Sequence, residues 1–109
     1  MGAIIKPFEL DEVKEALSAA GIEGMTAAEV KGPGRQKGHP EVDRRSEYTV
    51  GFVPKAKFKI AVANDAAAKV AEVILKAAGT DKIGNGRIFV MPLDEVIRVR
   101  TGETGEKAA

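Results

Sequence analysis

A glycine-rich segment that ends in a cation is the first candidate for anion chemistry. It reads Asp81-Lys82-Ile83-Gly84-Asn85-Gly86-Arg87. Glycines let backbone N–H groups come close to an anion, and the Arg87 guanidinium can add a bidentate contact to a phosphate. An ordinary Asn-Gly hairpin turn explains the same residues. Alone, the segment leaves a phosphate site and a plain turn as alternatives.

Two arginines near the C-terminus occupy alternate positions. Arg98 and Arg100 belong to the alternating run 96–100, which predicts a final strand. A period of two places both guanidinium groups on one face, where they repel unless they share an anion or acidic partners. A solvated strand face is the alternative. A further polar cluster lies between Gly34 and Gly38 and consists of Arg35, Gln36 and Lys37. Together the clusters favour a polyphosphate site.

The other reactive side chains do not form a catalytic pattern. His39 is the only histidine and has no acidic orienting partner beside it, so we expect it to be solvated. Tyr48, the only tyrosine, either folds back on the domain or, with Ser46 and Thr49, offers a hydroxyl for covalent modification. No Ser/His/Asp, paired-carboxylate or multi-histidine pattern stands out, which disfavours an enzyme. A phosphoryl transferase that uses His39 is the alternative.

Composition narrows the class of protein. The chain has 109 residues, the size of one domain, and a formal net charge of +1, which argues against a nucleic-acid partner. The absence of cysteine excludes disulfides, thiolate zinc sites and cysteine nucleophiles. Its apolar runs are far shorter than a membrane span, and we expect no membrane insertion and no signal peptide. A cytoplasmic protein is expected.

The order of elements predicts an α+β, ferredoxin-like fold. Apolar and alternating runs predict strands at 3–5, 25–30, 57–62, 88–91 and 96–100. Helical spacing predicts helices over about 9–20 and 66–78, stopped by Gly21 and Gly79, with an N-cap at Asn64-Asp65. This is the split βαβ pattern, with two helices on one face of an antiparallel sheet. The other face would need cover, which suggests self-association.

One long loop interrupts the pattern. From about 33 to 54 the chain is polar and charged, with glycine and proline punctuation, between the second and third predicted strands. Loops longer than about 12–15 residues are uncommon in compact domains and are usually functional or disordered. The tail, about 102–109, has little to bury and is expected to be mobile.

Several motifs in this order resemble the PII nitrogen regulatory family, from Ala3 to about Glu103. They are Ile4-Ile5-Lys6-Pro7-Phe8, Gly24-Met25-Thr26, Gly34-Arg35-Gln36-Lys37-Gly38-His39, Ser46-Glu47-Tyr48-Thr49-Val50, Lys82-Ile83-Gly84-Asn85-Gly86-Arg87-Ile88-Phe89-Val90 and Val96-Ile97-Arg98-Val99-Arg100-Thr101-Gly102-Glu103. The resemblance implies a non-enzymatic homotrimer whose sheets face a central barrel. It also implies that ATP or ADP binds in the clefts between subunits.

The resemblance also implies a role for individual residues. Nucleotide-binding residues would be Thr26, Gly34, Arg35, Ala61, Gly84, Asn85, Gly86, Arg87, Arg98 and Arg100. Those for 2-oxoglutarate would be Lys6, Gln36, Lys37, Gly38, Lys55 and Gly84, with Gln36 also holding Mg²⁺. Tyr48 matches a uridylylation site and Ser46 a phosphorylation site of family members.

The family's long loop docks into partners, so the resemblance implies regulation of such proteins. They include ammonium channels, glutamine-synthetase-modifying enzymes, a sensor kinase and metabolic enzymes.

Six residues depart from the family pattern: Asp43, Arg45, Lys59, Ala61, Asn85 and Arg87. Asp43 replaces a usual tyrosine at the loop tip, and Ala61 replaces a valine. Arg87 replaces a usual lysine, Asn85 an aspartate, Arg45 a glycine at the loop tip, and Lys59 a glutamate. The alternative function is a degenerate PII paralogue that acts as an interaction module without 2-oxoglutarate sensing.

Overall fold

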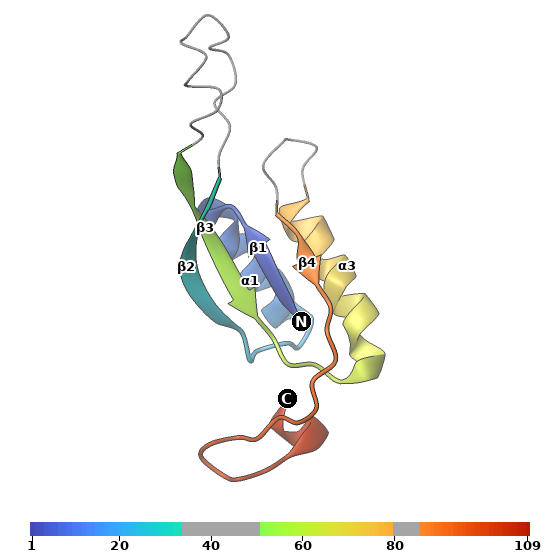
Figure 1. The fold of residues 1–109 in the computed structure, drawn as a ribbon. Helices are drawn as coiled ribbons and strands as arrows, with labels where there is room; N and C mark the ends of the chain where they lie inside the picture. The colour runs from blue at the N-terminus through green and yellow to red at the C-terminus, as the bar shows by residue number, and fades with distance from the viewer. Residues whose placement is uncertain (34–50, 80–85) are drawn as a thin grey trace, which may run out of the picture.

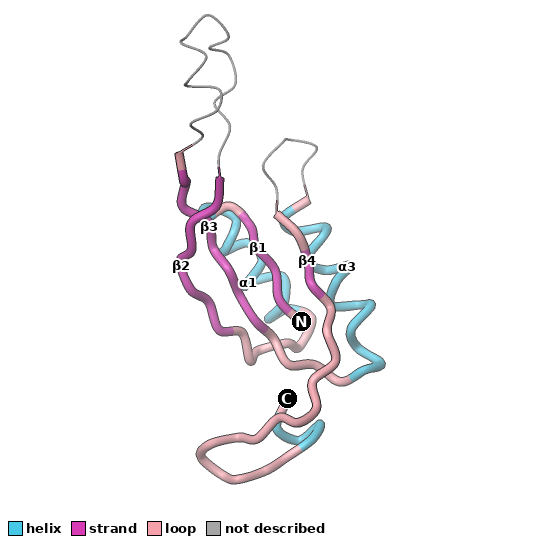
Figure 2. Tube along the Cα trace, in the orientation of Figure 1, coloured by secondary structure: helices cyan, strands magenta, loops and turns pink. Residues whose placement is uncertain are grey.

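The computed structural model describes residues 1–33, 51–79 and 86–109. Four strands form one sheet in the order β2-β3-β1-β4, and two helices pack on one side of it (Figure 1). The strands are β1 (Gly2–Ile5), β2 (Thr26–Pro33), β3 (Phe52–Lys59) and β4 (Ile88–Phe89), and the helices are α1 (Leu10–Ala19) and α3 (Ala67–Ala78). Three short 3-10 helices are η1 (Pro7–Glu9), η2 (Asn64–Ala66) and η3 (Gly105–Ala108). The α+β fold with its antiparallel sheet is as predicted (Figure 2).

The core forms where the apolar faces of the two helices meet the sheet. Val13 and Leu17 of α1 lie one turn apart and are buried, as are Val70 and Ile74 of α3. They pack in one cluster with Phe58 of β3. Burial of these side chains at helical spacing explains why both helices were predictable from sequence.

Helix α1 begins with a buried carboxylate. The predicted start at Glu9 is a 3-10 turn, and the α-helix proper starts at Leu10. The Glu9 Oε1 accepts a hydrogen bond from the Lys6 backbone N–H at 3.0 Å, and the Glu9 N–H donates to the Lys6 carbonyl at 3.0 Å. Glu9 is only 5% exposed. Its carboxylate therefore satisfies a backbone donor at the point where the chain leaves β1.

Strand β3 begins earlier than predicted. It covers 52–59 rather than 57–62, and it pairs with β2 as far as Phe52 and Pro33. Gly51 and Pro54, which are typical of loops, hid this pairing. Pro54 lies beyond Ala56, which is the last residue of β3 paired with β1, so its missing N–H costs no hydrogen bond to β1. The predicted loop of 33–54 is therefore shorter, because its described ends belong to a two-stranded ribbon.

The prediction of a final strand over 96–100 is wrong. Of residues 96–100, only Ile97 forms a β-bridge within the described part of the chain, and its partner is Thr104. Val99 in the same segment is 98% exposed. Alternation creates a strand only where a neighbouring strand supplies backbone partners. The segment instead forms a turn, closed by bonds from the Arg98 N–H to the Glu103 carbonyl and from the Gly102 N–H to the Arg98 carbonyl.

The end of β4 and the C-terminal segment also differ from the predictions. Strand β4 has two residues, Ile88 and Phe89, instead of the predicted four. Over 102–109 the structure has η3, whose first residue donates from its N–H to the Val96 carbonyl at 3.2 Å. The mobility of this tail stays a prediction. The predicted N-cap at Asn64-Asp65 is wrong: these residues begin η2, the N-cap of α3 is Ala66, and no side chain caps either helix.

The sheet face opposite the helices combines cations and apolar side chains. Lys55, Lys57 and Lys59 alternate in β3 with the buried Ala56 and Phe58, so the lysines occupy the face away from the core. Large apolar side chains of β4 and of the segment that follows it are also exposed: Phe89, Val90, Met91, Leu93, Ile97 and Val99. Several exposed apolar side chains in one region are typical of an interaction surface.

Candidate functional site

The structure describes eight of the predicted ligand-binding residues. They are Lys6, Thr26, Lys55, Ala61, Gly86, Arg87, Arg98 and Arg100. The other predicted residues lie outside the described ranges: Gly34, Arg35, Gln36, Lys37, Gly38, Gly84 and Asn85, the modification candidates Ser46 and Tyr48, and also His39 and Arg45. The geometry of the site is therefore built from the eight described residues.

Gly86 is required by backbone packing. A Cβ at this position would lie 1.3 Å from the carbonyl oxygen of Ile4, in the neighbouring strand β1. The next residue, Arg87, accepts a hydrogen bond at its carbonyl from the Ile4 N–H at 2.9 Å. Because both contacts are to backbone atoms, the close approach leaves no room for a side chain at residue 86. The sequence offered phosphate binding or a hairpin turn as the reason for this glycine, and neither revealed its packing against β1.

Lys6 and Lys55 lie at the same end of the sheet as Gly86 and Arg87. The β1–β3 register ends with Ile5 opposite Ala56, so the next residues on the two strands, Lys6 and Lys55, have adjoining backbone positions. Lys55 also lines a cavity of about 430 Å³ beside Pro7 and Glu29. The Lys6 ammonium lies 5.9 Å from the centre of the Phe8 ring. This end of the sheet therefore gathers positive charge on the side where β2 ends and β3 begins (Figure 1).

Thr26 and Ala61 line a second cavity, at the other end of the sheet. It has a volume of about 620 Å³, and Ile4, Phe89, Met91 and Leu93 supply apolar walls. Lys57 and Lys59 add ammonium groups, and Lys59 stands directly opposite Thr26 in the register. Apolar walls with a few polar groups are typical of small-molecule pockets. The combination suits a flat, uncharged ring joined to a charged group.

Arg98 and Arg100 also lie away from Gly86 and Arg87. The C-terminal segment that carries them extends from the end of the sheet opposite the start of β4 (Figure 1). The Arg98 Nη1 lies 3.3 Å from the Glu103 Oε1, and its Nη2 donates to the Lys107 carbonyl at 3.0 Å. The prediction that both arginines share one strand face fails, because no strand forms there.

Within one subunit, the predicted ligand-binding residues thus fall into two groups at opposite ends of the sheet. One group has Lys6, Lys55, Gly86 and Arg87, and the other has Thr26, Ala61, Arg98 and Arg100. Between Lys55 and Lys59, β3 alone spans about 13 Å at the usual rise per residue. The structure of one chain does not bring the two groups together.

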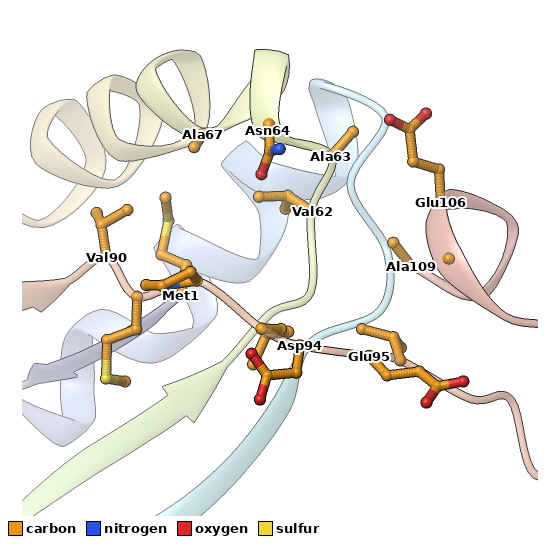
Figure 3. Close-up of a pocket in the computed structure, with 15 residues that line it drawn as sticks. Met1, Val62, Ala63, Asn64, Ala67, Val90, Asp94, Glu95, Glu106 and Ala109 are labelled. Atoms are coloured by element: carbon orange, nitrogen blue, oxygen red, sulfur yellow. The ribbon is translucent and has the colours of Figure 1, made fainter.

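A third cavity has the wrong charge for a polyanion. It has a volume of about 410 Å³ and is lined by Asp94, Glu95 and Glu106 among apolar side chains (Figure 3). No lysine or arginine is among its described lining residues. Carboxylates and phosphates repel each other at close range, so this cavity is not a candidate phosphate site.

The described residues contain no candidate metal centre and no helix that could span a membrane. No group of three or more His, Asp or Glu side chains there could hold a metal ion. In the same part of the chain, no helix has the length and apolar character to cross a bilayer. The predicted Mg²⁺ contact at Gln36 lies outside the described ranges.

The fold and the two groups of cations define a ferredoxin-like domain with surfaces suited to anionic ligands. The model of the family "Nitrogen regulatory protein P-II" matches residues 1–103. A nitrogen regulatory protein P-II of Cereibacter sphaeroides is 57% identical over 106 residues, covering 97% of this chain and 95% of that protein. The nitrogen regulatory protein GlnK of Escherichia coli K12 is 56% identical over 105 residues, covering 96% and 94%.

A solved structure agrees with this match. The crystal structure of Arabidopsis thaliana PII bound to citrate superimposes with a TM-score of 0.81 at 40% identity, covering 99% of this chain and 88% of that one. The chain belongs to the PII nitrogen regulatory family. It is a PII-type signalling protein and a non-enzymatic regulator, which confirms the resemblance seen in its motifs.

We predict that Gly86→Ala destabilises the fold. The new Cβ forces the β1 backbone to move, so the free energy of unfolding should fall by about 1–3 kcal/mol in a urea titration. Gly51→Ala is the matched control, since a Cβ at Gly51 meets no atom of the described residues within 4 Å, and it should change stability by less than about 0.5 kcal/mol. Equal stability of the two variants would contradict the packing role of Gly86.

Proposed function

We propose that this PII protein senses ATP or ADP together with 2-oxoglutarate and reports them to target proteins. The observation that carries the proposal is the division of its candidate ligand residues into two groups at opposite ends of the sheet. A site built where one chain's Gly86 and Arg87 meet another chain's Arg98 and Arg100 would surround a polyphosphate with cations. The family membership supports nucleotides as the polyphosphates.

A homotrimer would create such sites. Three copies arranged around a central axis would cover the open sheet face and the exposed apolar side chains of 89–99. Each contact between neighbours would form one nucleotide site, with the base in the cavity beside Thr26 and Ala61. Gly34, Arg35, Gly84 and Asn85 are proposed to contribute to this site on the family pattern.

The 2-oxoglutarate site is proposed at the end of the sheet beside Lys6 and Lys55. A dicarboxylate needs cations at both ends, and these two lysines, which adjoin each other at the β1–β3 end, would hold one carboxylate while the metal ion would hold the other end. Gln36, Lys37, Gly38 and Gly84 would complete the site, with Mg²⁺ held by Gln36 and the nucleotide. The Arabidopsis relative binds citrate, another carboxylate, which supports a carboxylate ligand on this fold.

Regulation is proposed to pass through the segment that joins β2 to β3. Ligands at the root of this segment would favour one of its conformations over others by differential contact. Its targets would be an ammonium channel, a glutamine-synthetase-modifying enzyme, a sensor kinase or a metabolic enzyme in the cytoplasm. Modification of Tyr48 or Ser46 would change the same surface.

One observation favours a second candidate, the degenerate PII paralogue. Lys59, where the family commonly has glutamate, lines the same cavity as Thr26 and Ala61. An altered pocket could leave an interaction module without 2-oxoglutarate sensing. A thermal-shift panel of ATP, ADP, AMP and 2-oxoglutarate, with and without Mg²⁺, separates the two candidates. A ligand at 100 times its Kd should add roughly 2.7 kcal/mol of stability per site.

The trimer predicts a particular mass in solution. Light scattering coupled to gel filtration should give three times the 11.5 kDa chain mass. In a trimer, neighbouring copies would cover the exposed apolar side chains. They would also complete the divided ligand site. A monomer at micromolar concentration would contradict the proposed shared site.

We expect Arg98→Ala to weaken ATP and ADP binding. Hydrogen bonds to charged groups contribute about 1.5–3 kcal/mol, so the Kd measured by calorimetry should rise about 10- to 100-fold. Lys14→Ala, which removes an exposed cation from α1, is the control and should leave the Kd unchanged. An unchanged Kd for Arg98→Ala would remove this arginine from the site.

Lys55→Ala should separate the two ligands. Loss of its ammonium should weaken 2-oxoglutarate binding at saturating ATP and Mg²⁺ by at least about tenfold, because a carboxylate loses its cation. ATP binding without 2-oxoglutarate should change less than about twofold. Equal losses for both ligands would contradict the assignment of Lys55 to the carboxylate.

A further inference from the structure

The Arg98 guanidinium is engaged within its own chain. Its Nη1 donates to the Glu103 Oε1 at 3.3 Å, and its Nη2 donates to the Lys107 carbonyl at 3.0 Å. The same Glu103 oxygen accepts a hydrogen bond from the Thr101 hydroxyl at 2.9 Å. The carboxylate therefore occupies an edge of the guanidinium that a phosphate oxygen would also use.

The backbone holds this carboxylate in place. The Arg98 N–H donates to the Glu103 carbonyl at 2.8 Å, and the Gly102 N–H donates to the Arg98 carbonyl at 2.7 Å. Gly102 has a φ of +74°, a conformation that glycine adopts without strain and that turns the chain back on itself. The turn thus places an acidic residue beside Arg98 by local structure alone.

We infer that Glu103 is an internal competitor for the polyphosphate at Arg98. This inference rests on the proposed function, in which Arg98 contacts phosphate. Binding would exchange one anion for another at the guanidinium: the Glu103 carboxylate leaves as a phosphate oxygen arrives. No covalent bond is made or broken in this exchange. Glu103 thereby lowers the affinity for every ligand that reaches Arg98, and it neutralises the arginine while the site is empty.

The size of the effect follows from exposure. Both side chains are 41% exposed, so water already screens the pair. A pair of this kind contributes little, and its loss should tighten ligand binding by about two- to fivefold. A carboxylate that instead held the guanidinium ready for phosphate would raise the affinity, so its loss would weaken binding. The sign of the change distinguishes a competitor from a positioning residue.

The test is Glu103→Gln in the full-length protein, with ATP and ADP titrated by calorimetry. Glutamine keeps an oxygen for the Thr101 hydroxyl and removes the charge, so the turn should persist. We expect the Kd for ATP to fall about two- to fivefold, and this gain should shrink as salt rises, since salt screens exposed pairs. Glu106→Gln, the same change three residues further on, is the matched control and should leave the Kd unchanged.

A double-mutant cycle isolates the contact. In an Arg98→Ala background, Glu103→Gln should have no effect on the Kd, because the competitor has lost its partner. An unchanged or raised Kd for Glu103→Gln alone, or the same gain for Glu106→Gln, would overturn the inference.

The cycle also separates the two proposals. If Arg98→Ala weakens ATP binding while Glu103→Gln does not tighten it, the competitor role fails and the proposed nucleotide site stands. If Arg98→Ala leaves the Kd unchanged, the proposed phosphate role of Arg98 fails, and the inference fails with it.

Discussion

The backbone pairing of the short strand β1 with both of its neighbours is the constraint on which the rest of this structure depends. All four of its residues pair with β3 on one side, and Gly2 and Ala3 pair with β4 on the other. The Ile4 N–H bonds to the Arg87 carbonyl, and Gly86 lies so close to Ile4 that it cannot carry a side chain. This one strand therefore brings Lys6, Lys55 and Arg87 to one end of the sheet, although they are far apart in the sequence.

Much of the fold could be predicted because its signals are local. The helical spacing of Val13 and Leu17, and of Val70 and Ile74, marks the faces that the structure buries. Strand ends were less predictable, since a strand extends as far as its partner does. Phe52 belongs to β3 because Pro33 lies opposite it. The alternation of 96–100 produced no strand, because within the described chain no neighbouring strand pairs with it.

The site was predictable in its residue types but not in its arrangement. Glycines and arginines near the C-terminus pointed to an anion, and the motifs pointed to a family that the comparisons confirm. Sequence spacing could not show that Gly86 also serves the packing of β1 and β4. Nor could it show which acidic residue meets Arg98. The repulsion expected between two arginines was a sign that acidic partners are needed, and Glu103 supplies one.

The ribbon of β2 and β3 has a mechanical consequence. Four residue pairs, from Val30 with Lys55 to Pro33 with Phe52, extend past the last pair that β3 makes with β1. This two-stranded extension projects about 10 Å from the part of the sheet that includes β1, and Lys55 lies at its base. A small tilt there is magnified along the extension. A ligand that shifted Lys55 would therefore displace Pro33 and Phe52, at the far end of this extension, by more than it displaced Lys55 itself.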